Sequence, residues 1–81
     1  MHEWLEAARD RLAAEAGLDL DTLSLTDAES EALLELARVA AHESGDRTNA
    51  PLACFLAGVA VGRDPSAELE RLVRALSGAP E

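Results

Sequence analysis

Apolar residues recur three or four positions apart in four segments of the chain, which is the spacing of one face of an α-helix. In the first segment Trp4, Ala8 and Leu12 are four residues apart, and Gly17 is placed to end the helix. The alternating stretch 18–25 has no second alternating segment to pair with, so we expect a packed connection with a helical turn. The pattern predicts an all-α fold, a compact four-helix bundle in a single domain over 1–81, with helices at about 2–16, 27–43, 50–62 and 65–77.

Residues at the helix ends agree with these limits. Thr26 followed by Glu29 is the pattern of a capping box, in which each side chain bonds the other residue's backbone N–H. Gly45 should end the second helix, and Thr48 or Asn49 should cap the third. Asp64 followed by proline is expected to open the fourth.

The third helix carries no charged residue from Ala50 to Gly62, so we expect it to be central, with the other helices around it. Gly58 in its interior costs about 1 kcal/mol relative to alanine, which indicates a close helix crossing there. The uncharged run 48–62 is shorter than the roughly 20 residues that span a bilayer, so we expect no membrane partner.

Composition narrows the function further. The 81 residues include sixteen acidic side chains and seven arginines, for a formal charge of −9, so nucleic acid is a poor partner. The charge indicates a solvated acidic surface or a basic partner. Cys54 has no second cysteine with which to form a disulfide, which fits a cytoplasmic protein with an inert thiol.

No catalytic motif or metal-ligand spacing is present, so we expect no enzyme, no metal and no cofactor. The stretch Asp21-Thr22-Leu23 matches the acyl-carrier motif poorly, because threonine replaces the serine that would carry the prosthetic arm. The most site-like residues are His42, Arg47, Thr48 and Asn49, where a helix N-terminus and an arginine fork could hold a phosphate or carboxylate. In the simpler interpretation Arg47 and His42 stabilise the end of the second helix.

Trp4 has two interpretations. Tryptophan is enriched among residues that dominate binding energies, so Trp4 is a candidate interface residue. In a small bundle such a residue also commonly closes the core.

The chain resembles a known family of small bacterial helical domains of unknown function. The resemblance is carried by the segments 4–5, 17–19, 36–42, 50–52 and 55–58, together with Arg47. Such domains occur free-standing and as C-terminal appendages of molybdenum-cofactor guanylyltransferase-like proteins. The resemblance implies a non-enzymatic accessory domain that binds a protein partner or itself beside molybdenum-cofactor assembly. The alternative function is a binding module for a nucleotide or pterin phosphate at the junction of the second and third helices.

Overall fold

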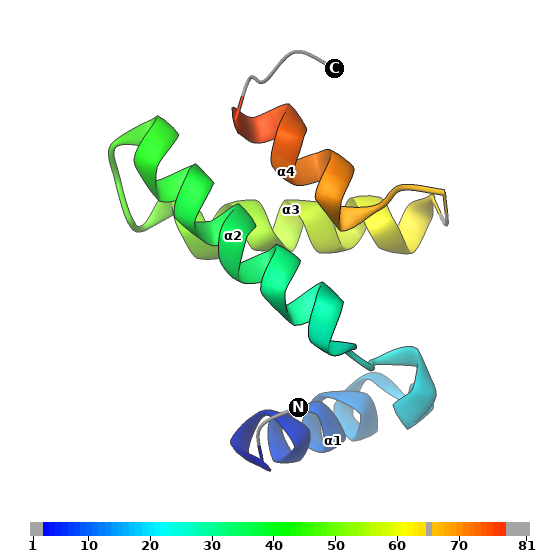
Figure 1. The fold of residues 1–81 in the computed structure, drawn as a ribbon. Helices are drawn as coiled ribbons and strands as arrows, with labels where there is room; N and C mark the ends of the chain where they lie inside the picture. The colour runs from blue at the N-terminus through cyan, green and yellow to red at the C-terminus, as the bar shows by residue number, and fades with distance from the viewer. Residues whose placement is uncertain (1–2, 65, 78–81) are drawn as a thin grey trace.

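The computed structural model describes residues 3–64 and 66–77, and in this part of the chain it contains helices and turns but no strand. The prediction of an all-α fold with four helices is therefore confirmed, and the alternating stretch forms one 3₁₀ turn (Figure 1). The elements in chain order are α1 (Glu3–Ala16), η1 (Leu20–Thr22), α2 (Asp27–Ser44), α3 (Asn49–Arg63) and α4 (Leu69–Ser77).

Both ends of α2 are formed as predicted. The hydroxyl of Thr26 accepts a hydrogen bond from the Glu29 N–H at 3.1 Å, and the Glu29 carboxylate accepts one from the Thr26 N–H at 2.8 Å. Gly45 ends the helix with φ of 72°, the left-handed conformation that glycine adopts most easily. These caps satisfy backbone groups that a helix leaves unpaired at its ends.

The predicted start of the fourth helix is wrong by several residues. The Asp64 carboxylate accepts hydrogen bonds from the N–H and the hydroxyl of Ser66, at 3.0 and 2.7 Å. The Asp64 carbonyl also accepts from the Ala67 N–H at 2.9 Å. Asp64 therefore stabilises a turn, and α4 begins only at Leu69. Position 65, where the helix was expected to open, lies outside the described residues.

The helices are not arranged around α3. The backbone of α2 lies close to both α3 and α4, whereas α1 comes close only to η1 among the described elements. Figure 1 shows α1 standing apart from the other three helices. The helix with the most neighbours is therefore α2, and the prediction that the third helix is surrounded by the others is wrong.

The core built in this way is small. Six of the described residues are buried apolar residues, and four of them are alanines: Ala13, Ala32, Leu36, Val39, Ala40 and Ala57. The radius of gyration is 13.4 Å, whereas a folded chain of this length is expected to have about 11.7 Å. The molecule is thus more open than its size requires.

The exposed side of α3 explains this openness. Leu52 is 62% exposed, Phe55 70% and Leu56 68%, because α2 and α4 cover only one side of the helix. A Cβ at Gly58 would meet no atom within 4 Å, so the predicted close crossing at this glycine is also wrong. None of the helices in the described part of the chain is both long and apolar enough to cross a bilayer.

Candidate interaction surface

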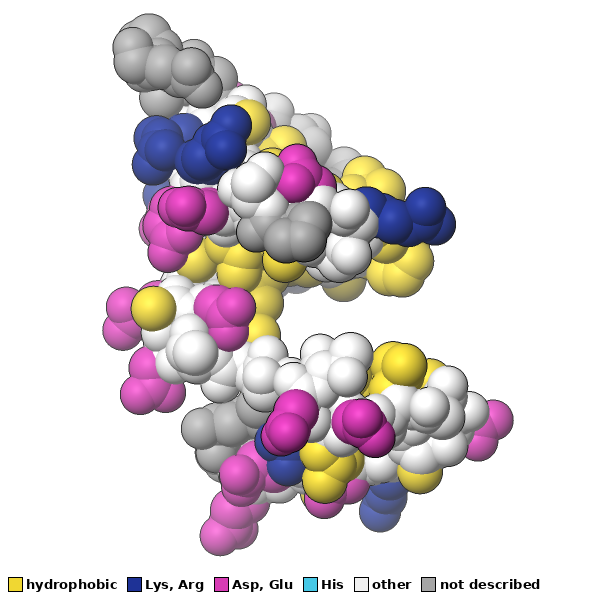
Figure 2. Space-filling view, turned by 90° about the vertical axis from the view of Figure 1, so that its right-hand side faces the viewer, with side chains coloured by type: hydrophobic (Ala, Val, Ile, Leu, Met, Phe, Trp, Pro, Cys, Tyr) yellow, Lys and Arg dark blue, Asp and Glu magenta, His cyan; other side chains and the backbone are white. Residues whose placement is uncertain are grey.

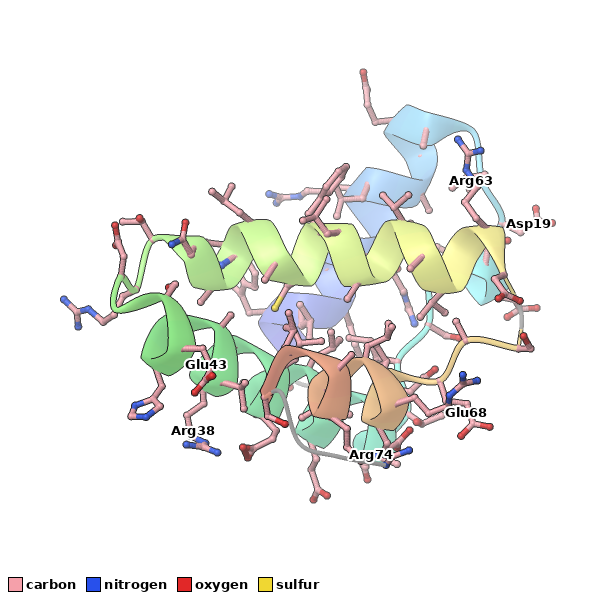
Figure 3. The ribbon with its side chains drawn as sticks, turned by 90° about the horizontal axis from the view of Figure 1, so that it is seen from above. Asp19, Arg38, Glu43, Arg63, Glu68 and Arg74 are labelled. Atoms are coloured by element: carbon pink, nitrogen blue, oxygen red, sulfur yellow. The ribbon has the colours of Figure 1, made fainter. Side chains whose placement is uncertain are left out.

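Four large apolar side chains form one exposed stripe along α3, and we call them the α3 surface: Leu52, Phe55, Leu56 and Val59. Their spacing of three, four and seven residues places them on one face of the helix. In Figure 3 the middle turns of α3 carry carbon-only side chains on the side away from α2 and α4. The labelled Arg38 and Glu43 of α2 project away from α3, and Arg63 lies at its end.

The opposite side of α3 consists of small residues. Ala53, Cys54, Ala57 and Ala60 are buried or half-buried there, and the Cys54 sulfur lies 3.9 Å from the Leu33 carbonyl oxygen of α2. Small side chains let α2 and α3 approach closely, so the large side chains of α3 are left on the outer side. The helix is therefore apolar on all sides, but its small side chains lie toward α2 and its large side chains lie on the outer side.

The apolar residues of α1 are also exposed. Trp4 is 72% exposed, Leu5 38% and Leu12 63%. Trp4 therefore lies at the surface and does not close the core. A role as an interface residue requires this surface location. Leu12 lines the space between α1 and α3, so part of the apolar side of α1 faces this space.

An open groove of about 490 Å³ separates α1 from the rest of the molecule, and we call it the α1–α3 groove. Arg9 and Leu12 line it from α1, and Gly58, Val61 and Gly62 line it from α3. Figure 2 shows a deep hollow between the two parts of the molecule, with hydrophobic side chains on both sides. Most of the side chains that line this groove are apolar or small, so it suits an apolar occupant.

The C-terminal end of α1 is capped by backbone hydrogen bonds. The Leu18 N–H donates to the Ala13 carbonyl at 2.9 Å, and the Gly17 N–H donates to the Ala14 carbonyl at 3.4 Å. Together with a φ of 69° at Gly17, these two bonds form a Schellman motif. Ala13 is 1% exposed, so this turn of α1 is packed as well as capped. The α1 side of the groove is therefore a helix with a capped and packed last turn.

The predicted anion site lies at the turn between α2 and α3, where the chain supplies its own anion. The Asp46 carboxylate accepts from the N–H and the hydroxyl of Thr48, at 2.9 and 2.7 Å. The N–H groups of Asn49 and Ala50 donate to the carbonyls of Asp46 and Arg47, each at 3.1 Å. The three N–H groups that a bound phosphate would use are therefore already paired within the turn.

The other residues of that predicted site, His42 and Arg47, do not form a binding site with the turn. His42 and Arg47 are both exposed, and Arg47 forms no ion pair with its neighbour Asp46. Hydrogen bonds from the Thr48 backbone and side chain hold the pKa of Asp46 below its usual range. This geometry does not favour an external anion over the carboxylate that already occupies the turn.

Other candidates for chemistry are few. Burial raises the pKa of the Cys54 thiol, so this thiol stays protonated near neutral pH. No group of three or more His, Cys, Asp or Glu residues among those described could hold a metal ion. A second cavity of about 200 Å³ lies between α2, α3 and α4 beside Leu36, and only alanine and leucine side chains line it. One of them is Leu56, which therefore lies at the edge of the α3 surface nearest to α4.

These features define a small all-α domain with an exposed apolar surface. The chain belongs to the family described as a domain of unknown function (DUF6457), whose model matches residues 1–80. No curated protein and no solved structure matches the chain. The match confirms the resemblance to a small domain of unknown function that the sequence indicated.

Proposed function

We propose that this chain is a non-enzymatic accessory domain that binds a protein through the α3 surface. The observation that supports this proposal is the stripe of Leu52, Phe55, Leu56 and Val59, which are between 43% and 70% exposed. Large contiguous apolar patches are uncommon on monomeric soluble proteins and often mark sites of interaction. A stripe with this spacing is also the pattern with which helices pack against one another.

The absence of an enzymatic role is part of the same proposal. An active site needs polar groups that converge on one place, with a nucleophile or an acid and base among them. The α1–α3 groove offers few such groups, and the Cys54 thiol is held protonated by burial on another side of α3. The surface is thus better suited to packing than to chemistry.

The biological setting in the proposal comes from the resemblance of the sequence to domains appended to molybdenum-cofactor guanylyltransferase-like proteins. We place the accessory role beside molybdenum-cofactor assembly on that resemblance. The partner bound there would present an apolar surface of its own, since α3 carries no charged residue from Asn49 to Gly62. The function would then be to hold proteins together during that assembly.

Affinity capture tests this proposal. The wild-type chain and the Leu52→Glu/Phe55→Glu variant are cross-linked in the native cytoplasm, and the captured proteins are compared by quantitative mass spectrometry. Leu34→Glu is the matched control, because Leu34 is 73% exposed on α2. We expect at least one protein, either a second copy of this chain or a molybdenum-cofactor protein, to be recovered with the wild type and the control and lost with the variant. Identical recovery with all three chains would contradict a role for the α3 surface.

A further inference from the structure

We propose that the partner of the α3 surface is a second copy of this chain, and that two copies form a symmetric dimer. This inference rests on the proposed function, because it names the occupant of the same surface. In the dimer each copy covers the α3 surface and the apolar side of α1 of the other, with Trp4, Leu5 and Leu12 at the contact. A symmetric arrangement of this kind uses the same patch on both copies and closes on itself.

The exposed area of one chain has the size that such a dimer needs. The accessible surface is 6251 Å², whereas a compact monomer of 8.6 kDa exposes about 4,700 Å². The excess is about 1,500 Å² per chain, so two copies that bury it lose about 3,000 Å² in total. Permanent homodimers bury roughly 2,000–5,000 Å². The excess area is therefore large enough for a stable homodimer.

The core of a single copy is small. Leu36 and Val39 are the only buried residues larger than alanine among those described. Ordering each residue costs on the order of 1.5 kcal/mol, which only extensive apolar burial offsets. A second copy supplies that burial at the α3 surface of each chain. It is also present wherever the chain is made, so stability does not depend on another protein.

Charge does not oppose this pairing. The formal charge of −9 would repel two copies if acidic side chains met at the contact. The α3 surface carries no charge, and α1 carries both signs, with Arg9 and Arg11 against four acidic residues, Glu3, Glu6, Asp10 and Glu15. Two arginines against four acids leave α1 with only −2 of the formal charge of −9. The acidic excess of the chain therefore lies largely outside the contact that we propose.

Closure of α1 onto α3 of the same chain is the main competing arrangement. The Schellman motif at Gly17 and the packing of Ala13 fix the direction in which the chain leaves α1. Closure would require this capped turn or the connection through η1 to rearrange. A second copy that covers the α3 surface leaves the capped turn and the connection through η1 unchanged.

Mass and fluorescence measurements on the wild-type chain test the dimer. We expect light scattering and sedimentation to give twice the chain mass, with dissociation on dilution. Trp4 is the only tryptophan, so its emission reports on this surface alone. Its emission should shift to longer wavelength at the same dilution at which the mass halves. In samples that mix labelled and unlabelled copies, isotope-filtered NMR should show contacts from α3 of one copy to α1 or α3 of the other.

Two matched variants locate the contact. Phe55→Glu places a carboxylate in the middle of the α3 surface and should weaken dimerisation at least about 30-fold. Leu34→Glu changes an equally exposed leucine on α2 and should leave dimerisation unchanged. The NMR contacts are measured on the wild type, so the test still holds if Phe55→Glu fails to fold.

Several results would overturn the proposal. One is a single-chain mass at every concentration with Trp4 emission typical of solvent exposure. Another is the same mass with emission typical of burial, which would show that α1 closes on its own chain. A dimer that survives Phe55→Glu unweakened, with or without an effect of Leu34→Glu, would place the contact elsewhere. A monomer that still captures another protein through the α3 surface would refute the dimer and support the proposed function. A monomer that captures nothing would refute both.

Discussion

Thr26 and Glu29 bind each other across the first turn of α2, with hydrogen bonds of 2.8 and 3.1 Å in opposite directions. Each bond satisfies a backbone N–H that the helix cannot pair internally. Since α2 contacts both α3 and α4, the cap stabilises the helix on which the fold is built.

The Thr26→Ala variant should therefore lose about 1 kcal/mol of unfolding free energy, because its N-cap bond is removed. Urea denaturation followed by circular dichroism measures this loss. Thr26→Ser keeps the hydroxyl and should stay within about 0.5 kcal/mol of the wild type. Equal losses for the two variants would show that the hydrogen bond is not the cause.

Leu36 is the one large side chain in the described part of the chain that is completely buried, and it lies where α2, α3 and α4 meet. Leu36→Ala should destabilise the fold by about 2 to 5 kcal/mol, because it removes buried methyl groups beside an existing cavity. Leu34→Ala is the control on the same helix, and it should change stability by less than about 0.5 kcal/mol. A small effect of Leu36→Ala in thermal or urea unfolding would mean that the core lies elsewhere.

The sequence was sufficient to predict the helices because local signals define them. The capping box at Thr26, the glycines at positions 17 and 45, and the apolar spacing of α2 all act within a few residues of one another. The start of α4 was missed because Ser66 lies two residues after Asp64, and its N–H and hydroxyl both donate to the Asp64 carboxylate. The same residue types can open a helix or close a turn, and the sequence pattern alone does not distinguish them.

The arrangement of the helices was harder to predict, because hydrophobicity does not say which side of an apolar helix is covered. The informative signal was side-chain size. Alanines at positions 53, 57 and 60 lie on one side of α3, and Leu52 and Phe55 lie on the other. Small residues mark the side where another helix can approach closely. The position of α1 could not be predicted either, because its apolar pattern predicts a helix but not that the helix comes close only to η1 among the described elements.

Two glycines should respond in opposite ways to substitution by alanine. Gly58 lies inside α3, and a Cβ there meets nothing within 4 Å. Gly58→Ala should therefore stabilise the fold by about 0.5 to 1 kcal/mol, because it reduces the entropy of the unfolded chain. Gly45 has φ of 72°, so Gly45→Ala should cost about 1 to 2 kcal/mol.

Urea denaturation measures the free energy of unfolding of these two variants. The protein concentration is one at which light scattering gives a single mass. If Gly58→Ala destabilised the fold, the result would support the close helix crossing that the sequence predicted, against the structure.

Phosphate should not bind at the turn between α2 and α3, because the N–H groups of Thr48, Asn49 and Ala50 are already paired. In a phosphate titration followed by amide NMR, we expect the signals of these residues to shift no more than those of exposed residues elsewhere. Arg47→Ala serves as the control, and its response should equal that of the wild type. A saturable shift that Arg47→Ala abolishes would instead support the anion-binding alternative.

The Asp46 carboxylate should titrate below its usual range. The Thr48 N–H lowers the Asp46 pKa most, and the Thr48 hydroxyl lowers it further, because both donate to the charged form. With a pKa lower in the folded than in the unfolded chain, Asp46 stabilises the fold at pH values above its ordinary pKa. This stabilisation is lost as the pH falls through the folded pKa.

NMR titration of the Asp46 side chain measures this pKa directly. Thr48→Val removes the hydroxyl but keeps the N–H, so we expect it to raise the Asp46 pKa only part of the way toward its ordinary value. Asp46→Asn should remove this contribution to the acid dependence of unfolding while preserving an acceptor for the Thr48 N–H. An Asp46 pKa at its ordinary value in the wild type would show that the turn is not held closed by this carboxylate.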